Sequence, residues 1–110
     1  MIIDFEKIET TVIPQFRGGE KNTVANMYVD NLNKIMFGKL EVGASIGMHT
    51  HQTNSEIIYI ISGDGKCLYD DTEEALSSGS CHYCPKGHKH SLINNSNSED
   101  LVFFAVIPEQ

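Results

Sequence analysis

The chain has 110 residues, enough for one domain with one core and too few for two. Its 15 acidic side chains outnumber its 8 basic ones, and the formal net charge of -7 would repel nucleic acid and anionic membrane surfaces. We therefore expect no nucleic-acid partner and no membrane partner. The amino terminus lacks a basic start followed by a long apolar stretch, and three cysteines are an odd number for a disulfide framework. These features predict a cytoplasmic protein with reduced thiols.

The first 25 residues are the least regular part of the sequence. Arg17-Gly18-Gly19-Glu20 punctuates them as a loop. We predict that residues 1–25 form a strand or loop segment that packs on the rest of the domain or on a second subunit. Arg17 could clamp a substrate carboxylate from this loop, although a surface arginine is the default interpretation.

From residue 26 onward, short apolar or alternating runs recur between turn residues. No window sustains the apolar spacing of an amphipathic helix, so the pattern predicts an all-β fold with little or no helix. The candidate strands are Asn26–Val29, Ile35–Val42, Gly47–His51, Glu56–Ser62, Lys66–Tyr69, His82–Cys84, His90–Asn94 and Leu101–Ile107. Strands of this length and spacing indicate a sandwich or a barrel, and the pattern alone leaves both open.

Two of the predicted strands are apolar on both faces. Neither Ile57–Ile61 nor Leu101–Ile107 alternates between apolar and polar residues. Their outer faces must therefore be covered, either by the amino-terminal segment of the same chain or by a second subunit. We expect a homodimer.

Three histidines and one glutamate are spaced as the ligands of a metal site would be. His49 and His51 are two residues apart, which on a strand puts both imidazoles on one face. Glu56 opens the next strand after a four-residue turn, and His90 comes from a distant segment. Three imidazoles and a carboxylate suit one divalent transition metal, namely Fe, Mn, Ni, Co, Cu or Zn, and suit Ca or Mg poorly.

These four residues lie within two longer patterns. Gly43–Gly63 reads G-x5-H-x-H-x4-E-x6-G, and Gly79–Asn94 reads G-x5-P-x-G-x2-H-x3-N. At every fixed position they match the two motifs of the cupin family, which the chain resembles over residues 43 to 94. Ten fixed positions in order are not expected to match by chance when a common residue type fills about one position in twenty.

The resemblance to cupins implies a fold and a ligand set. The fold is a jelly-roll barrel, or double-stranded β-helix, which we assign to residues 26–110, with the metal near one open end. The implied ligands are His49, His51, Glu56 and His90, while the glycines and the proline of the motifs would form turns.

Other reactive side chains have simpler interpretations. Cys81-His82-Tyr83-Cys84 has the C-x2-C spacing of zinc and redox sites, but residues three apart on a strand point to opposite faces, so packing is preferred. The acidic run Asp70–Glu74 is interpreted as a solvated hairpin tip. His88 is either a solvated turn residue or a catalytic side chain beside the metal, able to exchange protons near neutral pH.

Two functions remain open at this stage. The first is a metal-dependent enzyme acting on a small oxygen-rich or carbonyl metabolite, as a dioxygenase or as an isomerase or lyase. We expect Met48, Ile58, Ile60, Leu92 and residues of the last strand to give its site an apolar lining. The second is a non-catalytic module that binds or senses a small ligand. The sequence identifies neither the substrate nor the metal.

Overall fold

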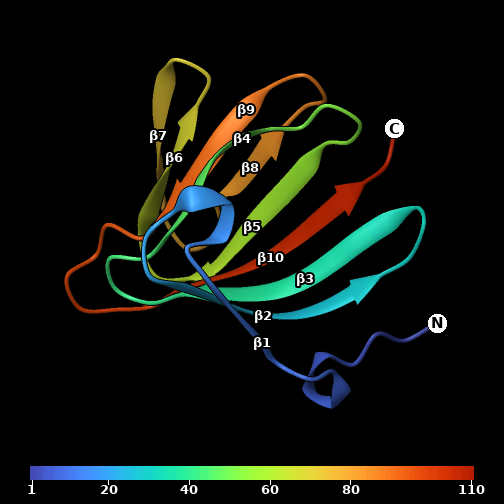
Figure 1. Ribbon diagram of the computed structural model, residues 1–110. Helices are drawn as coiled ribbons and strands as arrows, with labels where there is room; N and C mark the ends of the chain where they lie inside the picture. The colour runs from blue at the N-terminus through green and yellow to red at the C-terminus, as the bar shows by residue number, and fades with distance from the viewer.

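The computed structural model describes residues 1–110 as two antiparallel β-sheets with two short 3-10 helices (Figure 1). This confirms the predicted all-β fold. The elements in chain order are η1 (Phe5–Lys7), β1 (Thr11–Pro14), η2 (Phe16–Gly18), β2 (Asn22–Val29), β3 (Asn33–Leu40), β4 (Ser45–Thr50), β5 (Glu56–Ser62), β6 (Gly65–Tyr69), β7 (Thr72–Leu76), β8 (Cys81–Cys84), β9 (Lys89–Ile93) and β10 (Leu101–Pro108). The chain contains no helix with the length and hydrophobicity that a membrane span requires.

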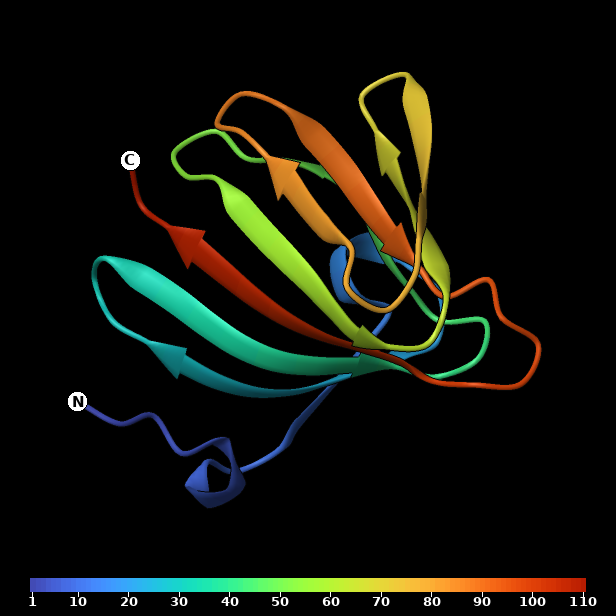
Figure 2. The ribbon, with the colours of Figure 1, turned by 180° about the vertical axis from the view of Figure 1, so that it is seen from behind.

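The two sheets face each other and form a barrel that is wider at one end. The larger sheet has the order β1-β2-β3-β10-β5-β8, and the smaller has the order β4-β9-β6-β7. Figures 1 and 2 show the sheets converging where the loops before β4 and β10 lie, and spreading apart toward the β2–β3 turn and the carboxyl terminus. The end of β4, the start of β5 and the start of β9 all lie at the wide end.

The core fills the space between the sheets because alternate residues of each strand point inward. On β10, Leu101, Phe103 and Ala105 are fully buried. Gly38 on β3 lies opposite Phe103, and a Cβ at this position would come within 2.4 Å of the phenyl ring. Glycine is therefore required for Phe103 to occupy the centre of the barrel.

β7 was not predicted, and β1 was predicted only as part of a strand or loop segment over residues 1–25; both lie at the edge of a sheet. β1 pairs only with β2, and β7 pairs only with β6. An edge strand needs fewer apolar residues, and β7 reads Thr-Glu-Glu-Ala-Leu. The interpretation of Asp70–Glu74 as a hairpin tip is thus wrong for its second half: Asp70 and Asp71 form the turn, whereas Glu74 belongs to β7 and faces the buried His82.

Replacing the central core residue tests this packing. Phe103→Ala leaves a cavity that Gly38 cannot fill, and we expect it to lower the free energy of unfolding by about 3–5 kcal/mol in urea denaturation of the metal-free protein. The control Leu32→Ala, at a position that is 62% exposed, should change it by about 0.5 kcal/mol or less. Equal effects of the two substitutions would contradict the assignment of Phe103 to the core.

Candidate metal centre

The four predicted ligands come together at the wide end of the barrel. β4 pairs with β9 so that His49 lies opposite His90, and both side chains point inward. His51 follows the last residue of β4, where its backbone exchanges two hydrogen bonds with the loop residues Gly87 and His88. Glu56 is the first residue of β5 and is 4% exposed. The two sheets therefore each contribute to one cluster.

The distances within the cluster fit a single ion. The Nε2 atoms of His51 and His90 lie 2.9 Å apart, and Oε1 of Glu56 lies 3.1 Å from the first and 2.9 Å from the second. Nε2 of His49 lies 3.9 Å from the same oxygen, and all four ligand atoms lie within 4.8 Å of one another. When ligand atoms each lie about 2.1 Å from one ion, neighbouring ligand atoms are about 3.0 Å apart in an octahedral site and about 3.4 Å apart in a tetrahedral site. The close triangle of ligand atoms thus resembles a face of an octahedron.

Two of the histidine rings are held by hydrogen bonds on the side away from the cluster. Nδ1 of His49 donates to the carbonyl of Gly47 at 2.7 Å, and Nδ1 of His51 donates to Oδ1 of Asn54 at 2.6 Å. The Asn54 amide nitrogen donates to Glu109, so its oxygen is the atom left to face His51. With Nδ1 protonated, each neutral ring has its lone pair on Nε2, where a metal would bind.

His90 also has a partner on its far side, one that sequence reasoning missed. Its Nδ1 lies 3.0 Å from Nε2 of His82, and Nδ1 of His82 lies 2.7 Å from a carboxylate oxygen of Glu74. The available signal was strand alternation, which places His82 on the same face of β8 as Cys84 and so inside the barrel.

The electrostatics of the cluster favour a charged carboxylate. Burial alone would raise the pKa of Glu56, but its contacts with His49, His51 and His90 outweigh burial and hold that pKa well below its ordinary value. Burial lowers the pKa of His90 despite its contact with Glu56. Burial would also lower the pKa of His51, but the contacts with Glu56 and Asn54 have the larger combined effect and raise it.

The structure places His88 outside the cluster. Its Nδ1 lies 2.7 Å from a carboxylate oxygen of Asp70 and 3.2 Å from the Tyr69 hydroxyl, and its side chain is 43% exposed. Its side chain forms no hydrogen bond with any of the four ligand residues. The catalytic role of His88 stays a prediction.

The two cysteines of the C-x2-C motif do not share a site. Cys81 is exposed and Cys84 is buried, which confirms that the two thiols of the C-x2-C motif lie on opposite faces of β8. Burial raises the pKa of Cys84 to about 12, so this thiol is a poor nucleophile and a poor metal ligand at neutral pH.

A cavity of about 130 Å³ lies beside His51, and it is polar rather than apolar. Its lining residues are Arg17, Val29, Asp30, Asn33, Lys34, His51, Asn54, Ile107 and Glu109. Of the residues expected to give the site an apolar lining, only Ile107 of the last strand borders this cavity. Ile58, Ile60 and Leu92 belong to the core, and Met48 is 43% exposed because it neighbours the inward-facing His49 and so points outward.

Arg17 reaches this cavity from a tightly constrained loop. It adopts left-handed backbone angles at φ +55°, as do its neighbours Gln15 and Lys21 at φ +48° and +53°. Such conformations cost about 1–3 kcal/mol each and persist only where the surrounding structure enforces them. This loop packs closely on β4, where a Cβ on Gly47 would come within 2.1 Å of the Arg17 carbonyl oxygen. Residues 15–21 thus form a fixed support for the Arg17 side chain.

Comparison with known families identifies the fold. The family model described as "Cupin domain" matches residues 36–107, so the chain belongs to the cupin family. The crystal structure of an RmlC-like cupin from Shewanella frigidimarina superposes with a TM-score of 0.81 at 14% identity, covering 99% of this chain and 90% of that one. This similarity confirms the jelly-roll barrel that the two sequence motifs implied.

Two similar proteins come from Thermotoga maritima. An oxalate-binding protein is 36% identical over 69 residues, which span 63% of this chain and 56% of that relative. The crystal structure of a predicted oxalate decarboxylase has a TM-score of 0.92 at 28% identity, and the superposition covers 100% of both chains.

Replacing the carboxylate ligand tests the metal centre. Glu56→Gln should weaken the binding of Mn(II), Co(II) or Zn(II), measured by calorimetric titration, by more than the 10- to 100-fold typical of losing an outer-shell partner. The control Glu41→Gln removes the same charge from an exposed loop and should bind as the wild type does. At 100 times Kd the metal should stabilise the wild type by about 2.7 kcal/mol. Unchanged affinity of Glu56→Gln would rule out this ligand set.

Proposed function

We propose that this cupin binds a small dicarboxylate of the oxalate class at a divalent transition metal held by His49, His51, Glu56 and His90. The observation that carries the proposal is the pair of cationic side chains, Arg17 and Lys34, in the cavity beside His51. When bound, such a metal supplies positive charge and open coordination positions for carboxylate oxygens. Of the four ligand residues only His51 lines this cavity, and Arg17 is near enough to act on its charge, so a ligand with two carboxylates would extend from the metal past His51 toward the cations.

The two cations are free to bind an anion. Neither Arg17 nor Lys34 forms a salt bridge or a side-chain hydrogen bond within the protein. Two other basic side chains, Lys7 and Lys89, are also unpaired, but neither lines this cavity. A guanidinium can hold a carboxylate through two parallel hydrogen bonds, and an ammonium adds a point charge.

The two acidic residues that line the same cavity are already engaged. Asp30 accepts hydrogen bonds from the backbone of Leu32 and Asn33, and these bonds lower its pKa. Glu109 accepts from the Asn54 amide and, at 3.3 Å, from the Thr53 hydroxyl. Their charges are thus partly neutralised by fixed donors, which leaves Arg17 and Lys34 as the groups that face an incoming ligand.

The size of the cavity favours a compact ligand. Its volume of about 130 Å³ is that of roughly four water molecules at about 30 Å³ each. Oxalate-sized dicarboxylates suit this space, whereas a long-chain acid would have to extend into solvent. The names of the two Thermotoga maritima relatives point to the same ligand class.

A lyase reaction is the second candidate, favoured by the likeness to a predicted oxalate decarboxylase. Cleavage of the carbon–carbon bond of oxalate yields carbon dioxide and formate and consumes one proton. The lowered pKa of Asp30 makes it a poor proton donor near neutral pH. We therefore propose binding as the first function and turnover as the second candidate. Dioxygenase and isomerase reactions, and a proton-exchanging role of His88, stay predictions.

We also propose that a second copy of the chain covers the outer face of the larger sheet. On β5, Ile57, Tyr59 and Ile61 point outward and are 40–46% exposed, and Tyr83 on the neighbouring β8 is 54% exposed. An exposed apolar patch of this kind marks an interaction surface, and a pair of such faces is self-complementary in a symmetric dimer. A cytoplasmic location is a separate prediction that the fold leaves open.

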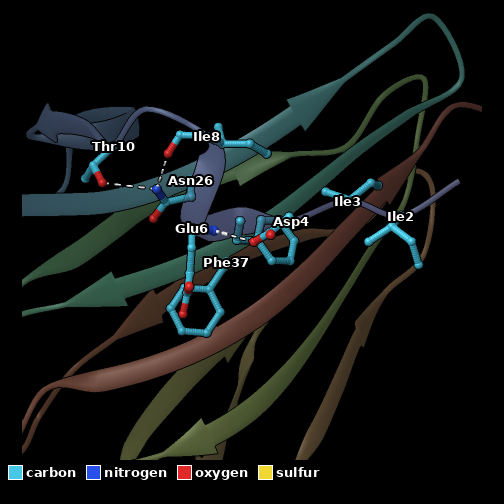
Figure 3. A pocket seen from close by; sticks show the side chains of 9 residues that line it. Ile2, Ile3, Asp4, Glu6, Ile8, Thr10, Asn26 and Phe37 are labelled. Carbon is cyan, nitrogen blue, oxygen red and sulfur yellow. Dashed lines mark hydrogen bonds between the residues drawn. The ribbon is translucent and has the colours of Figure 1, made fainter.

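The amino-terminal segment covers only one side of this face. The Phe5 ring packs against Phe37 and Phe104, with centroids 6.0 Å and 6.2 Å apart. Between this segment and the sheet lies a groove of about 780 Å³, in which Ile2, Ile3 and Phe37 are seen together (Figure 3). The groove adds apolar surface for the second copy, beside the uncovered residues of β5.

Ligand binding can be tested with single-charge variants. In calorimetric titrations of the metal-loaded protein with oxalate, Arg17→Gln and Lys34→Gln should each weaken binding by about tenfold or more, because each removes a charged hydrogen bond worth about 1.5–3 kcal/mol. Lys39→Gln, on the outer face, removes the same charge and should have no effect. Parallel assays for formate report turnover. Wild-type protein that binds metal but shows no affinity for oxalate, malonate or other short dicarboxylates would overturn the proposal.

The dimer proposal is tested by sedimentation equilibrium. The wild type should sediment with twice the 12.2 kDa mass of the chain, whereas Tyr59→Asp should shift it toward the monomer because a charge would be buried at the interface. Thr50→Asp, at an exposed position of the smaller sheet, is the matched control. A monomeric wild type at 100 µM would contradict the proposed interface.

A further inference from the structure

The hydrogen-bonded chain behind His90 has a role that the ligand set alone does not assign. We infer that Glu74 and His82 are positioning residues of the metal centre, which hold the His90 ring and its proton so that the Nε2 lone pair faces the ion. The inference rests on the proposed metal site. It concerns two residues outside the cupin motif positions, brought together from the edge strands of the two sheets, β7 and β8.

The geometry of the two rings fits a directed hydrogen bond. Nδ1 of His90 and Nε2 of His82 lie 3.0 Å apart, while the ring centroids are 5.2 Å apart and the ring planes differ by only 22°. With the nitrogens so close, this centroid separation means that the rings lie end to end in nearly one plane. An N–H in the plane of one ring then points at the in-plane lone pair of the other.

The carboxylate at the end of the chain decides which nitrogen carries each proton. An ionised Glu74 can only accept, so His82 donates from Nδ1 across the 2.7 Å contact. A neutral His82 then has its lone pair on Nε2, which can only accept from Nδ1 of His90. His90 is thereby left with its own lone pair on Nε2, directed at the cluster. One charged group therefore fixes the tautomer of two rings.

The surroundings keep this chain in place. The side chains of His82 and His90 are both 1% exposed, and the edge of the Tyr69 ring packs on His82 at an interplanar angle of 80°. The side chain of Glu74 is 43% exposed, so its carboxylate stays partly solvated. The other two ligand rings are held by neutral oxygens, of Gly47 and Asn54, whereas His90 is held by a second imidazole that itself contacts a carboxylate.

A second histidine–carboxylate pair in the same region provides a matched control. Asp70 contacts His88 at 2.7 Å, the same distance as Glu74 to His82, but this pair reaches no ligand side chain. Glu74→Gln and Asp70→Asn therefore make the same chemical change at partly exposed carboxylates. Only the first should affect the metal centre.

The experiment measures Zn(II) affinity by competition with a chromophoric chelator, together with imidazole ¹⁵N spectra of the Zn(II)-loaded protein. His82→Leu should weaken affinity about 10- to 100-fold, the range typical of losing an outer-shell partner. His82→Gln, which keeps a carbonyl acceptor for His90, should recover most of that loss. Glu74→Gln should weaken affinity by about tenfold, and Asp70→Asn by less than twofold. The wild-type spectra should show both His82 and His90 protonated at Nδ1.

The outcomes separate the inference from the metal site itself. If the wild type binds Zn(II) but His82→Leu and Glu74→Gln stay within twofold of it, or if His82 is protonated at Nε2 instead, the positioning role is overturned while the ligand set stands. If the wild type binds no divalent transition metal, the proposed site fails and the inference fails with it. Glu74 is half exposed, so the result for Glu74→Gln does not depend on whether the protein core tolerates a substitution.

Discussion

The site depends on the burial of one negative charge. Glu56 is 4% exposed and has no lysine or arginine within salt-bridge distance, so three imidazoles must supply all its partners. A carboxylate buried in this way is costly unless positive charge lies beside it. In the absence of a metal, only protonated histidines can provide that charge. Contact with Glu56 raises the pKa of His51, whereas burial lowers that of His90. A divalent cation at the centre of the four ligand atoms would supply the remaining positive charge.

The barrel separates packing from chemistry along its axis. β10 begins at the end where the sheets converge, and its first inward residues, Leu101 and Phe103, belong to the apolar core, whereas the metal cluster lies at the end where the sheets spread. On β9, two successive inward-facing residues belong to different parts of the barrel: Leu92 to the apolar core and His90 to the metal cluster. The cluster is thus placed on strands whose register is set by the core, while the strained loop that carries Arg17 closes the cavity beside it.

Local sequence patterns predicted most of the fold and the ligand set. Eight of the ten strands follow from apolar runs, and the spacing of His49, His51 and Glu56 with the second motif around His90 identified the residues that the structure brings together. These features are local, or belong to motifs with fixed spacing. The edge strands β1 and β7 were not identified as separate strands because their sequences lack the apolar pattern of a strand that is packed on both sides.

The missed parts of the site depend on contacts between distant segments. Glu74 was grouped with its acidic neighbours, and its contact with His82 exists only because β7 and β8 meet across the seam of the two sheets. The position of Arg17 beside His51 likewise depends on the packing of its loop against β4. Met48 was predicted to line the site because it is apolar. Its position next to the inward-facing His49 on a strand already indicated that it faces outward.

The central claim is that three imidazoles and one carboxylate bind one ion. Elemental analysis and X-ray absorption spectroscopy of protein purified without added metal or chelator test it most directly. The account predicts one first-row transition metal per chain, with an absorption spectrum that shows three imidazole ligands. Protein that contains no such metal, and that retains none after incubation with Mn(II), Fe(II), Co(II), Ni(II), Cu(II) or Zn(II) and dialysis, would contradict it.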